Sequence, residues 1–135
     1  MKFLLLSDKN DYMVTRVKNE TTDFYCTNDI SEFLSRTADI CFIDFGTVCS
    51  IYSLCIGESS WELRQLVKHI EENQNTKYYF CLTMPSDSYN EYDEIWMLSN
   101  VIKVTYFEWA KADAIKRIIK GKYVKPADFD KELIY

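Results

Sequence analysis

Short runs of apolar residues alternate along this chain with stretches whose apolar residues recur at helical spacing. The most uniform run is residues 40–43, four apolar residues that lead directly into Asp44. A run without polar alternation is typical of a strand that is buried on both faces of a parallel sheet. We expect this strand to cover residues 39–44, and further strands to cover residues 2–6, 23–27, 77–83 and 101–105.

Between these runs the apolar positions follow the helical period of about 3.6 residues. The clearest helix is predicted at residues 61–73, where Trp61, Leu66 and Ile70 share one side. Shorter helices are expected after the polar turns that follow the first two strands. Besides residues 61–73, helices are therefore predicted at residues 12–17, 30–34, 91–98 and 108–120. The last of these is expected to end at Gly121.

The alternation of strands and helices predicts an α/β fold, a three-layer αβα sandwich around a five-stranded parallel sheet. Right-handed crossovers limit the possible topologies, and we expect the flavodoxin-like strand order 2-1-3-4-5. Residues 1–121 are predicted to form one domain, with residues 122–135 as a tail that packs on it. Residues 48–56 are apolar except for two serines, and form either an extra strand or a tight crossover.

The composition agrees with a single globular domain that is large enough to bury a core. The chain has 135 residues, of which 47% are hydrophobic and 16% aromatic, with only 3 Gly and 2 Pro. Its five cysteines form no CxxC pair and no Cys/His metal spacing, which favours reduced thiols in the cytoplasm. We find no secretory signal and no apolar run of about 18 residues, so we expect no membrane association.

The charge is negative overall and unevenly distributed. A net charge of -5 makes nucleic acid an unlikely partner. Residues 101–125 nevertheless carry seven basic and two acidic side chains, and they follow an acidic stretch at residues 87–94 that includes Tyr89 and Tyr92. A solvated helix face, with cations in its last turn, accounts for this pattern. The alternative is a surface that binds a protein, either another protein or a second copy in a homodimer.

Asp8 and Asp44 are the strongest candidates for a functional site. They follow the first and third strands, which are neighbours in the predicted order, so both belong at the carboxyl edge of the sheet. Two close carboxylates raise one another's pKa or bind a divalent cation such as Mg²⁺. The structural alternative is that Asp8 caps a helix and Asp44 bonds to the turn after its strand. No nucleotide-binding motif is present, and His69 has no catalytic partner in the sequence.

Over residues 2–121 the chain resembles the receiver domain of bacterial response regulators, in the order of its elements more than in identity. Asp8 stands at one of the two acidic positions that follow the first strand of that family. Asp44 stands at the phospho-accepting aspartate, and Thr83 at the Ser or Thr that ends the fourth strand. The resemblance implies a receiver-like fold, and a true receiver would take a phosphoryl group on Asp44 beside Mg²⁺.

Three departures from the family pattern affect the predicted chemistry. Ser7 replaces the second acid, Lys103 lies two or three positions before the family's lysine on the fifth strand, and residues 48–56 have no counterpart in compact members. A Mg²⁺ site depends on carboxylates, and a shift of one residue along a strand reverses the face of a side chain. These departures predict a degenerate pseudo-receiver without ordinary phosphotransfer.

We therefore expect a non-enzymatic, regulatory protein-interaction module that needs no cofactor. Its contact surface is predicted to include Thr83, Tyr89, Tyr92, Tyr106 and Trp109. One alternative is a small acidic inhibitor or immunity protein of a phage or mobile element, which covers the basic site of a toxin or defence protein. A second alternative is a divalent-metal-dependent hydrolase, or a true phospho-receiver, that uses Asp8 and Asp44.

Overall fold

The computed structural model describes residues 1–44, 46, 61–82 and 93–124 of the chain. Five parallel strands form one sheet in the order β2-β1-β3-β4-β5, which confirms the predicted topology. The strand register places Leu6 opposite Ile43, and Asp44 opposite Cys81. The strands are β1 (Phe3–Leu6), β2 (Phe24–Thr27), β3 (Ile40–Asp44), β4 (Lys77–Cys81) and β5 (Val101–Val104).

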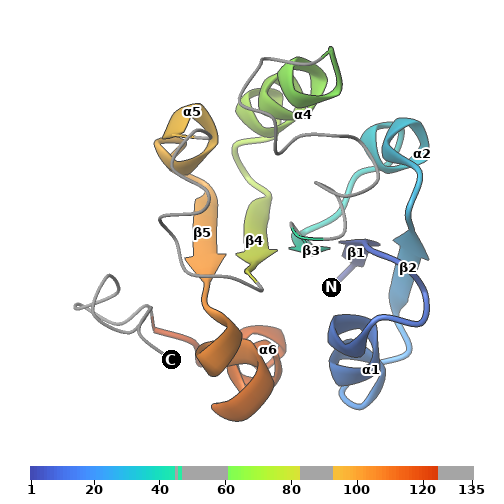
Figure 1. Cartoon of the computed structure of the whole chain (residues 1–135), viewed down its shortest axis with the longest axis vertical. Helices are drawn as coiled ribbons and strands as arrows, with labels where there is room; N and C mark the ends of the chain where they lie inside the picture. Colours follow the sequence, from blue (N-terminus) through green and yellow to red (C-terminus); the bar gives the residue numbers. More distant parts are fainter. Residues whose placement is uncertain (45, 47–60, 83–92, 125–135) are drawn as a thin grey trace.

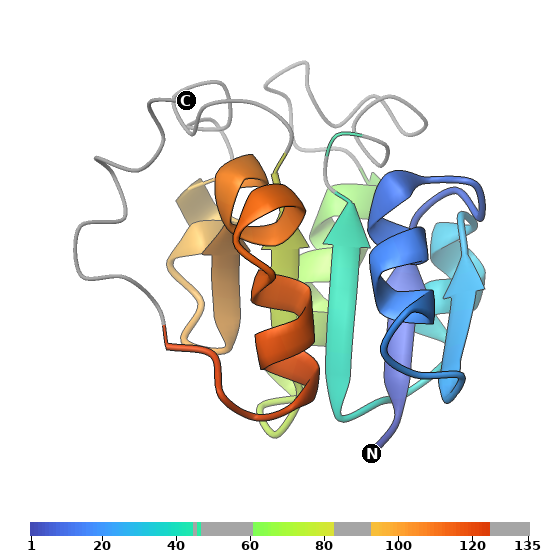
Figure 2. The same cartoon turned by 90° about the horizontal axis from the view of Figure 1, so that it is seen from below.

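Helices cover both faces of the sheet and give the predicted αβα sandwich (Figure 1). One face carries α2 (Ile30–Leu34), α4 (Trp61–Glu72) and α5 (Asp93–Trp96). The other face carries α1 (Tyr12–Lys18), the π-helical turn η3 (Phe107–Lys111) and α6 (Ala114–Ile119), and Figure 2 views the molecule from this side. Within the described part of the chain, no helix is long and apolar enough to cross a membrane.

The middle strand β3 is buried on both faces, as its uninterrupted apolar run predicts. Cys41 and Ile43 pack into the core beneath α2 and α4, whereas Ile40 and Phe42 pack into the core beneath α1 and α6. The ring of Phe42 lies 6.2 Å from that of Phe3 and 5.8 Å from that of Tyr79, measured between centroids. Strand alternation thus sends every second side chain of β3 into each of two separate cores.

Two aspartates start the helices that follow β1 and β2. The Asp11 carboxylate accepts a hydrogen bond of 3.0 Å from the backbone N–H of Met13, which caps α1. The Asp29 carboxylate accepts from the N–H groups of Ser31 and Glu32, which caps α2. Both side chains satisfy N–H groups that a helix leaves without a partner in its first turn.

The single helix predicted at residues 108–120 is wrong, because the structure divides this segment into η3 and α6. Asp113 lies between them with a φ of 55°, in the left-handed region that non-glycine residues rarely adopt. The guanidinium of Arg16, on α1, donates a hydrogen bond to the carbonyl oxygen of Ala110 at this break. A contact between residues 94 positions apart therefore stabilises the break, and no local pattern in residues 108–120 reveals it. The predicted termination at Gly121, with a φ of 70°, agrees with the structure.

Asn100 ties the end of α4 to the start of β5. Its side-chain amide, which is buried, lies 3.0 to 3.1 Å from the backbone carbonyl oxygens of Ile70, Asn73 and Thr76. Carbonyl groups in the last turn of a helix have no partner within the helix, so an external donor stabilises them. One amide side chain therefore fixes the loop that carries the chain from α4 into β4.

Parts of the sequence-based scheme lie outside the described residues. The extra apolar segment at residues 48–56 is one such part, and most of the tail is another. Of the tail, Tyr123 is described, and its ring packs edge-on against Tyr79 of β4 with 6.1 Å between centroids. The packing of residues 125–135 on the domain stays a prediction.

His69 of α4 bonds to the buried side chain of Tyr78 in β4. The Nδ1 atom of His69 lies 3.0 Å from the hydroxyl oxygen of Tyr78. Burial lowers the pKa of His69, against the opposite effects of a hydrogen bond to the Arg36 backbone and the charge of Glu72. A neutral ring can accept from the Tyr78 hydroxyl at Nδ1 or donate to its oxygen, according to its tautomer, whereas a charged ring can only donate. It is the burial of the ring that favours the neutral form.

We predict that His69 titrates below the ordinary histidine value of about 6.5 and makes folding pH-dependent. Because the folded chain binds this proton more weakly than the unfolded chain, its contribution to stability is complete above about pH 6.5. The contribution is lost as the pH falls through the lower pKa of the folded state. His69 is the chain's single histidine, so proton NMR of its ring reads this pKa directly.

The matched variant for this prediction is His69→Gln, which removes the titration and leaves every carboxylate in place. Between about pH 8 and pH 5, urea unfolding should show wild-type protein losing more free energy of unfolding than the variant. A ring pKa at or above the ordinary value, or parallel pH profiles for the two proteins, contradicts the proposed role of burial.

Candidate functional site

The carboxyl edge of the sheet brings together the ends of β1, β3, β4 and β5. Asp44 ends β3 there and is 2% exposed. Strand alternation places its side chain on the same face as Phe42, the face that α1 and α6 cover. Cys81, opposite Asp44 in β4, lies on this face too, and burial raises the pKa of its thiol, as do the charges of Asp44, Asp11 and Glu108. Asp44 is thus enclosed between the sheet and a helical layer.

Asp8, the second predicted acid, is exposed in the turn after β1. Its carboxylate accepts a hydrogen bond of 2.9 Å from the backbone N–H of Asn10, so it closes the turn, while Asp11 caps the helix. The suggestion that Asp8 caps α1 is therefore wrong by three positions. Its charge acts on Cys26 of β2, whereas that of Asp44 acts on Cys81 of β4.

The other positions of the receiver pattern have structural surroundings of their own. Ser7 is buried and its hydroxyl donates to the backbone carbonyl of Asp8. The ammonium of Lys103 lies 5.4 Å from the centroid of the Trp96 ring, on the face that α4 and α5 cover and therefore opposite to Asp44. Among the described residues, no three His, Cys, Asp or Glu side chains are grouped to hold a metal ion. The Mg²⁺ site at Asp8 and Asp44 stays a prediction.

The predicted contact residues divide into three groups. Thr83, Tyr89 and Tyr92 lie outside the described residues. Tyr106 is 37% exposed, at the start of η3. Trp109 is 2% exposed, and its indole N–H donates a hydrogen bond of 2.9 Å to the carbonyl oxygen of Leu82. Direct contact of Trp109 with a partner does not agree with this burial, because the ring fills the core between β4 and η3.

Trp109 instead supports exposed aromatic residues from beneath. Its ring centroid lies 5.3 Å from that of Tyr106 and 6.0 Å from that of Tyr12 on α1. Tyr12 is 50% exposed, and Phe107, next to Tyr106, is 49% exposed. We call Tyr12, Tyr106 and Phe107 the aromatic patch. Aromatic rings that are exposed on a rigid base are characteristic of protein contact surfaces.

Glu108 fixes the position of η3, and the sequence analysis missed its role. One of its carboxyl oxygens accepts a hydrogen bond of 2.9 Å from the backbone N–H of Thr105, and the Thr105 hydroxyl accepts one from the N–H of Glu108. The two residues form a capping box, whose Thr-x-x-Glu pattern is readable in the sequence. The expected start of the helix at Glu108 overlooked this pattern, in which Thr105 is the capping residue and η3 begins at Phe107.

The second carboxyl oxygen of Glu108 connects η3 to the segment after α6. It accepts a hydrogen bond of 2.6 Å from the hydroxyl of Tyr123. Burial and this bond raise the pKa of Tyr123, so the phenol keeps its proton and remains the donor. Glu108 is buried, and each of its two oxygens has a partner within the protein. The Glu108 carboxyl group therefore stabilises the segment that carries the aromatic patch.

We predict that Glu108→Ala destabilises the protein by roughly 2–4 kcal/mol, because it leaves the buried Thr105 N–H and Tyr123 O–H without their acceptor. Glu108→Gln should cost less, since its amide oxygen can accept from Thr105 and its amide nitrogen can donate to the Tyr123 oxygen. Urea unfolding measures both variants, with Tyr123→Phe as the control for the tyrosine bond alone. Equal costs for Ala and Gln contradict this assignment.

No protein-family model, no curated protein and no solved structure matches the chain. The fold class therefore stands on the sheet order and the helical layers of this chain, and the case for a function depends on the residues at its carboxyl edge.

Proposed function

We propose that this protein is a non-enzymatic protein-interaction module with a receiver-like fold, and that the aromatic patch is its contact surface. The observation that carries the proposal is the exposure of Tyr12 and Tyr106 on the buried ring of Trp109, with the exposed Phe107 next to Tyr106 in the chain. Exposed aromatic side chains lose little conformational entropy on binding and bury a large area, so they dominate many interfaces. A partner that covers the patch removes this apolar surface from water.

The rigidity of the patch supports this proposal. Trp109 is held by its bond to Leu82, Glu108 fixes the start of η3, and the Arg16 guanidinium stacks 4.7 Å from the centroid of the Tyr12 ring. Tyr12 and Tyr106 are therefore ordered before a partner arrives. A preorganised surface binds more tightly than one that must be ordered on binding.

The burial of Asp44 supports a role without phosphotransfer. A phospho-accepting carboxylate must reach the phosphorus atom of a donor and then accommodate the added oxygens. Asp44 is 2% exposed, beside the thiol of Cys81 and under the layer of α1 and α6. Lys103 faces the opposite core and gives no cation at this position. These observations favour the pseudo-receiver interpretation over the metal-dependent alternatives.

We predict that the double variant Tyr106→Ser/Phe107→Ser loses its partner while it keeps its fold. Affinity capture from native cells should recover one protein with the wild-type chain and at least about tenfold less of it with the variant, since exposed aromatic anchors carry much of an interface's energy. Binding of the purified partner then confirms a direct contact. The control is Met97→Ser, which removes an apolar side chain that is 84% exposed after α5.

The identity of the captured protein separates the two classes of binding function. A signalling protein agrees with a regulatory module, whereas a nuclease, toxin or defence protein assigns the chain to the inhibitor class. Equal recovery with the wild type and the Tyr106→Ser/Phe107→Ser variant removes the aromatic patch as the contact surface.

We also predict that a small phosphodonor and Mg²⁺ leave Asp44 unmodified. Intact-mass spectrometry of wild-type protein and of Asp44→Asn should show the same absence of an added phosphoryl group, because the carboxylate is enclosed. Stoichiometric labelling of the wild type that Asp44→Asn abolishes would establish a true phospho-receiver instead.

A further inference from the structure

The segment that carries η3 and α6 has a charge opposite to that of the rest of the chain. Residues 101–124 contain six basic and two acidic side chains, while all other residues together contain ten basic and nineteen acidic ones. One of the two acids, Glu108, is buried and bonded to Thr105 and Tyr123. The other, Asp113, lies 3.9 Å from Arg16. The exposed charge of this segment is therefore predominantly positive.

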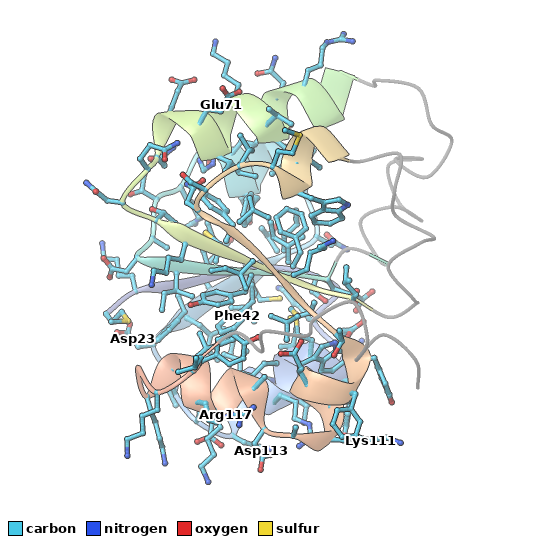
Figure 3. The ribbon with its side chains drawn as sticks, turned by 90° about the vertical axis from the view of Figure 1, so that its left-hand side faces the viewer. Asp23, Phe42, Glu71, Lys111, Asp113 and Arg117 are labelled. Carbon is cyan, nitrogen blue, oxygen red and sulfur yellow. The ribbon has the colours of Figure 1, made fainter. Side chains whose placement is uncertain are left out.

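Four exposed cations form the outer surface of this segment, and we call them the basic patch. They are Lys111, Lys116, Arg117 and Lys120. Figure 3 shows Lys111 and Arg117 on the outer side of the α6 layer, facing away from the sheet. None of the four forms an ion pair with an acid in the described part of the chain. The guanidinium of Arg117 lies 5.9 Å from the centroid of the Tyr123 ring, so the three lysines carry the charge that is available to a partner.

The basic patch adjoins the aromatic patch. Phe107 and Lys111 are both exposed and lie four residues apart in η3, a spacing that places side chains on the same side of a helical turn. Lys116 in α6 and Lys120, the residue that follows this helix, have the same spacing. Phe107 and Lys111 therefore lie on one side of η3, and Lys116 and Lys120 lie on one side of the helical segment that follows it.

We propose that the partner presents an acidic segment that carries an aromatic or aliphatic anchor residue. The anchor packs on the aromatic patch, and the carboxylates beside it face the basic patch. This inference rests on the proposed function and adds the chemistry of the partner. Complementary charge increases the rate of association and selects among partners, while the apolar anchor supplies affinity.

The distribution of charge favours an acidic protein segment over nucleic acid. A nucleic acid carries charge along its whole length, and the acidic remainder of this chain repels it beyond the basic patch. A short acidic protein segment can be covered by the basic patch alone, so the acidic remainder of the chain does not repel it.

The test selects binders from a random dodecapeptide library displayed on phage, with the full-length chain immobilised as bait. We expect the enriched peptides to combine several Asp or Glu residues with an aromatic or aliphatic residue. The best peptide is then synthesised with a fluorescent label, and its affinity is measured by anisotropy. Binding should weaken when ionic strength is raised to about 0.5 M, because salt screens exposed charges.

Charge reversal of the basic patch supplies the decisive variant. Lys116→Glu/Lys120→Glu should weaken the selected peptide at least about tenfold, since two attractive contacts become repulsive. Arg64→Glu/Lys68→Glu is the matched control, because it reverses two exposed cations at the same spacing on α4, across the sheet. The milder Lys116→Gln/Lys120→Gln, with a smaller loss of affinity, excludes misfolding as the cause.

Several results overturn the acidic partner. They are enrichment of neutral or basic peptides, no enrichment at all, or tighter binding of a single-stranded oligonucleotide or of phosphatidylserine vesicles than of the peptide. Self-association that Lys116→Glu/Lys120→Glu abolishes in analytical ultracentrifugation assigns the surface to a second copy instead. If Tyr106→Ser/Phe107→Ser weakens the peptide and charge reversal does not, the proposed function stands and this inference falls. If neither variant weakens it, both fall.

Discussion

The buried carboxyl group of Glu108 is the constraint on which the carboxyl edge of this protein depends. Its two oxygens bond to Thr105 at the end of β5 and to Tyr123 after α6, so one side chain joins the start and the end of the η3–α6 unit. A buried acceptor with two internal donors resists displacement, because moving it leaves polar groups without partners. Trp109, the next residue, is thereby placed under Tyr106 and Tyr12. The exposed rings owe their positions to a polar network beneath them.

The two faces of the sheet differ in the residues that they bury and in the surface that their helices present. The face under α2, α4 and α5 holds an apolar core in which Lys103 lies against Trp96, and Asn100 and His69 tie α4 to the strands. The face under α1 and α6 encloses Asp44 and Cys81 and carries the exposed rings and cations on its outer side. The acids Asp44 and Glu108 are buried beneath this helical layer, while most of the charged side chains on its surface are basic. The same segment can therefore hold the fold together and present a charged surface.

The sequence predicts this fold well because a strand that is buried on both faces is indicated by a local pattern, an uninterrupted apolar run. The apolar run at residues 40–43 and the alternation of elements predict the layers, and right-handed crossovers limit the sheet order to a few candidates that include the observed one. Interactions between distant residues are less predictable. Arg16 of α1 bonds to Ala110 near the break at Asp113, and the buried Trp109 bonds to Leu82, the residue after β4. The capping box at Thr105 and Glu108 was readable from spacing, whereas the hydrogen bond from Tyr123 required the fold. The sequence therefore predicted that a site would lie at the carboxyl edge of the sheet more reliably than it predicted which residues form it.

The contact between Arg16 of α1 and the segment around Asp113 determines when a ligand can recognise the aromatic patch. Tyr12 comes from the first helix of the chain, while Tyr106 and Phe107 come from near its end. The three rings form a composite epitope that exists only when α1 and η3 are docked together. If either α1 or η3 detaches from the other, the three rings no longer lie together, although both stretches of sequence remain intact. A ligand of this surface would therefore distinguish the folded chain from its unfolded or truncated forms, and it would act as a conformational sensor.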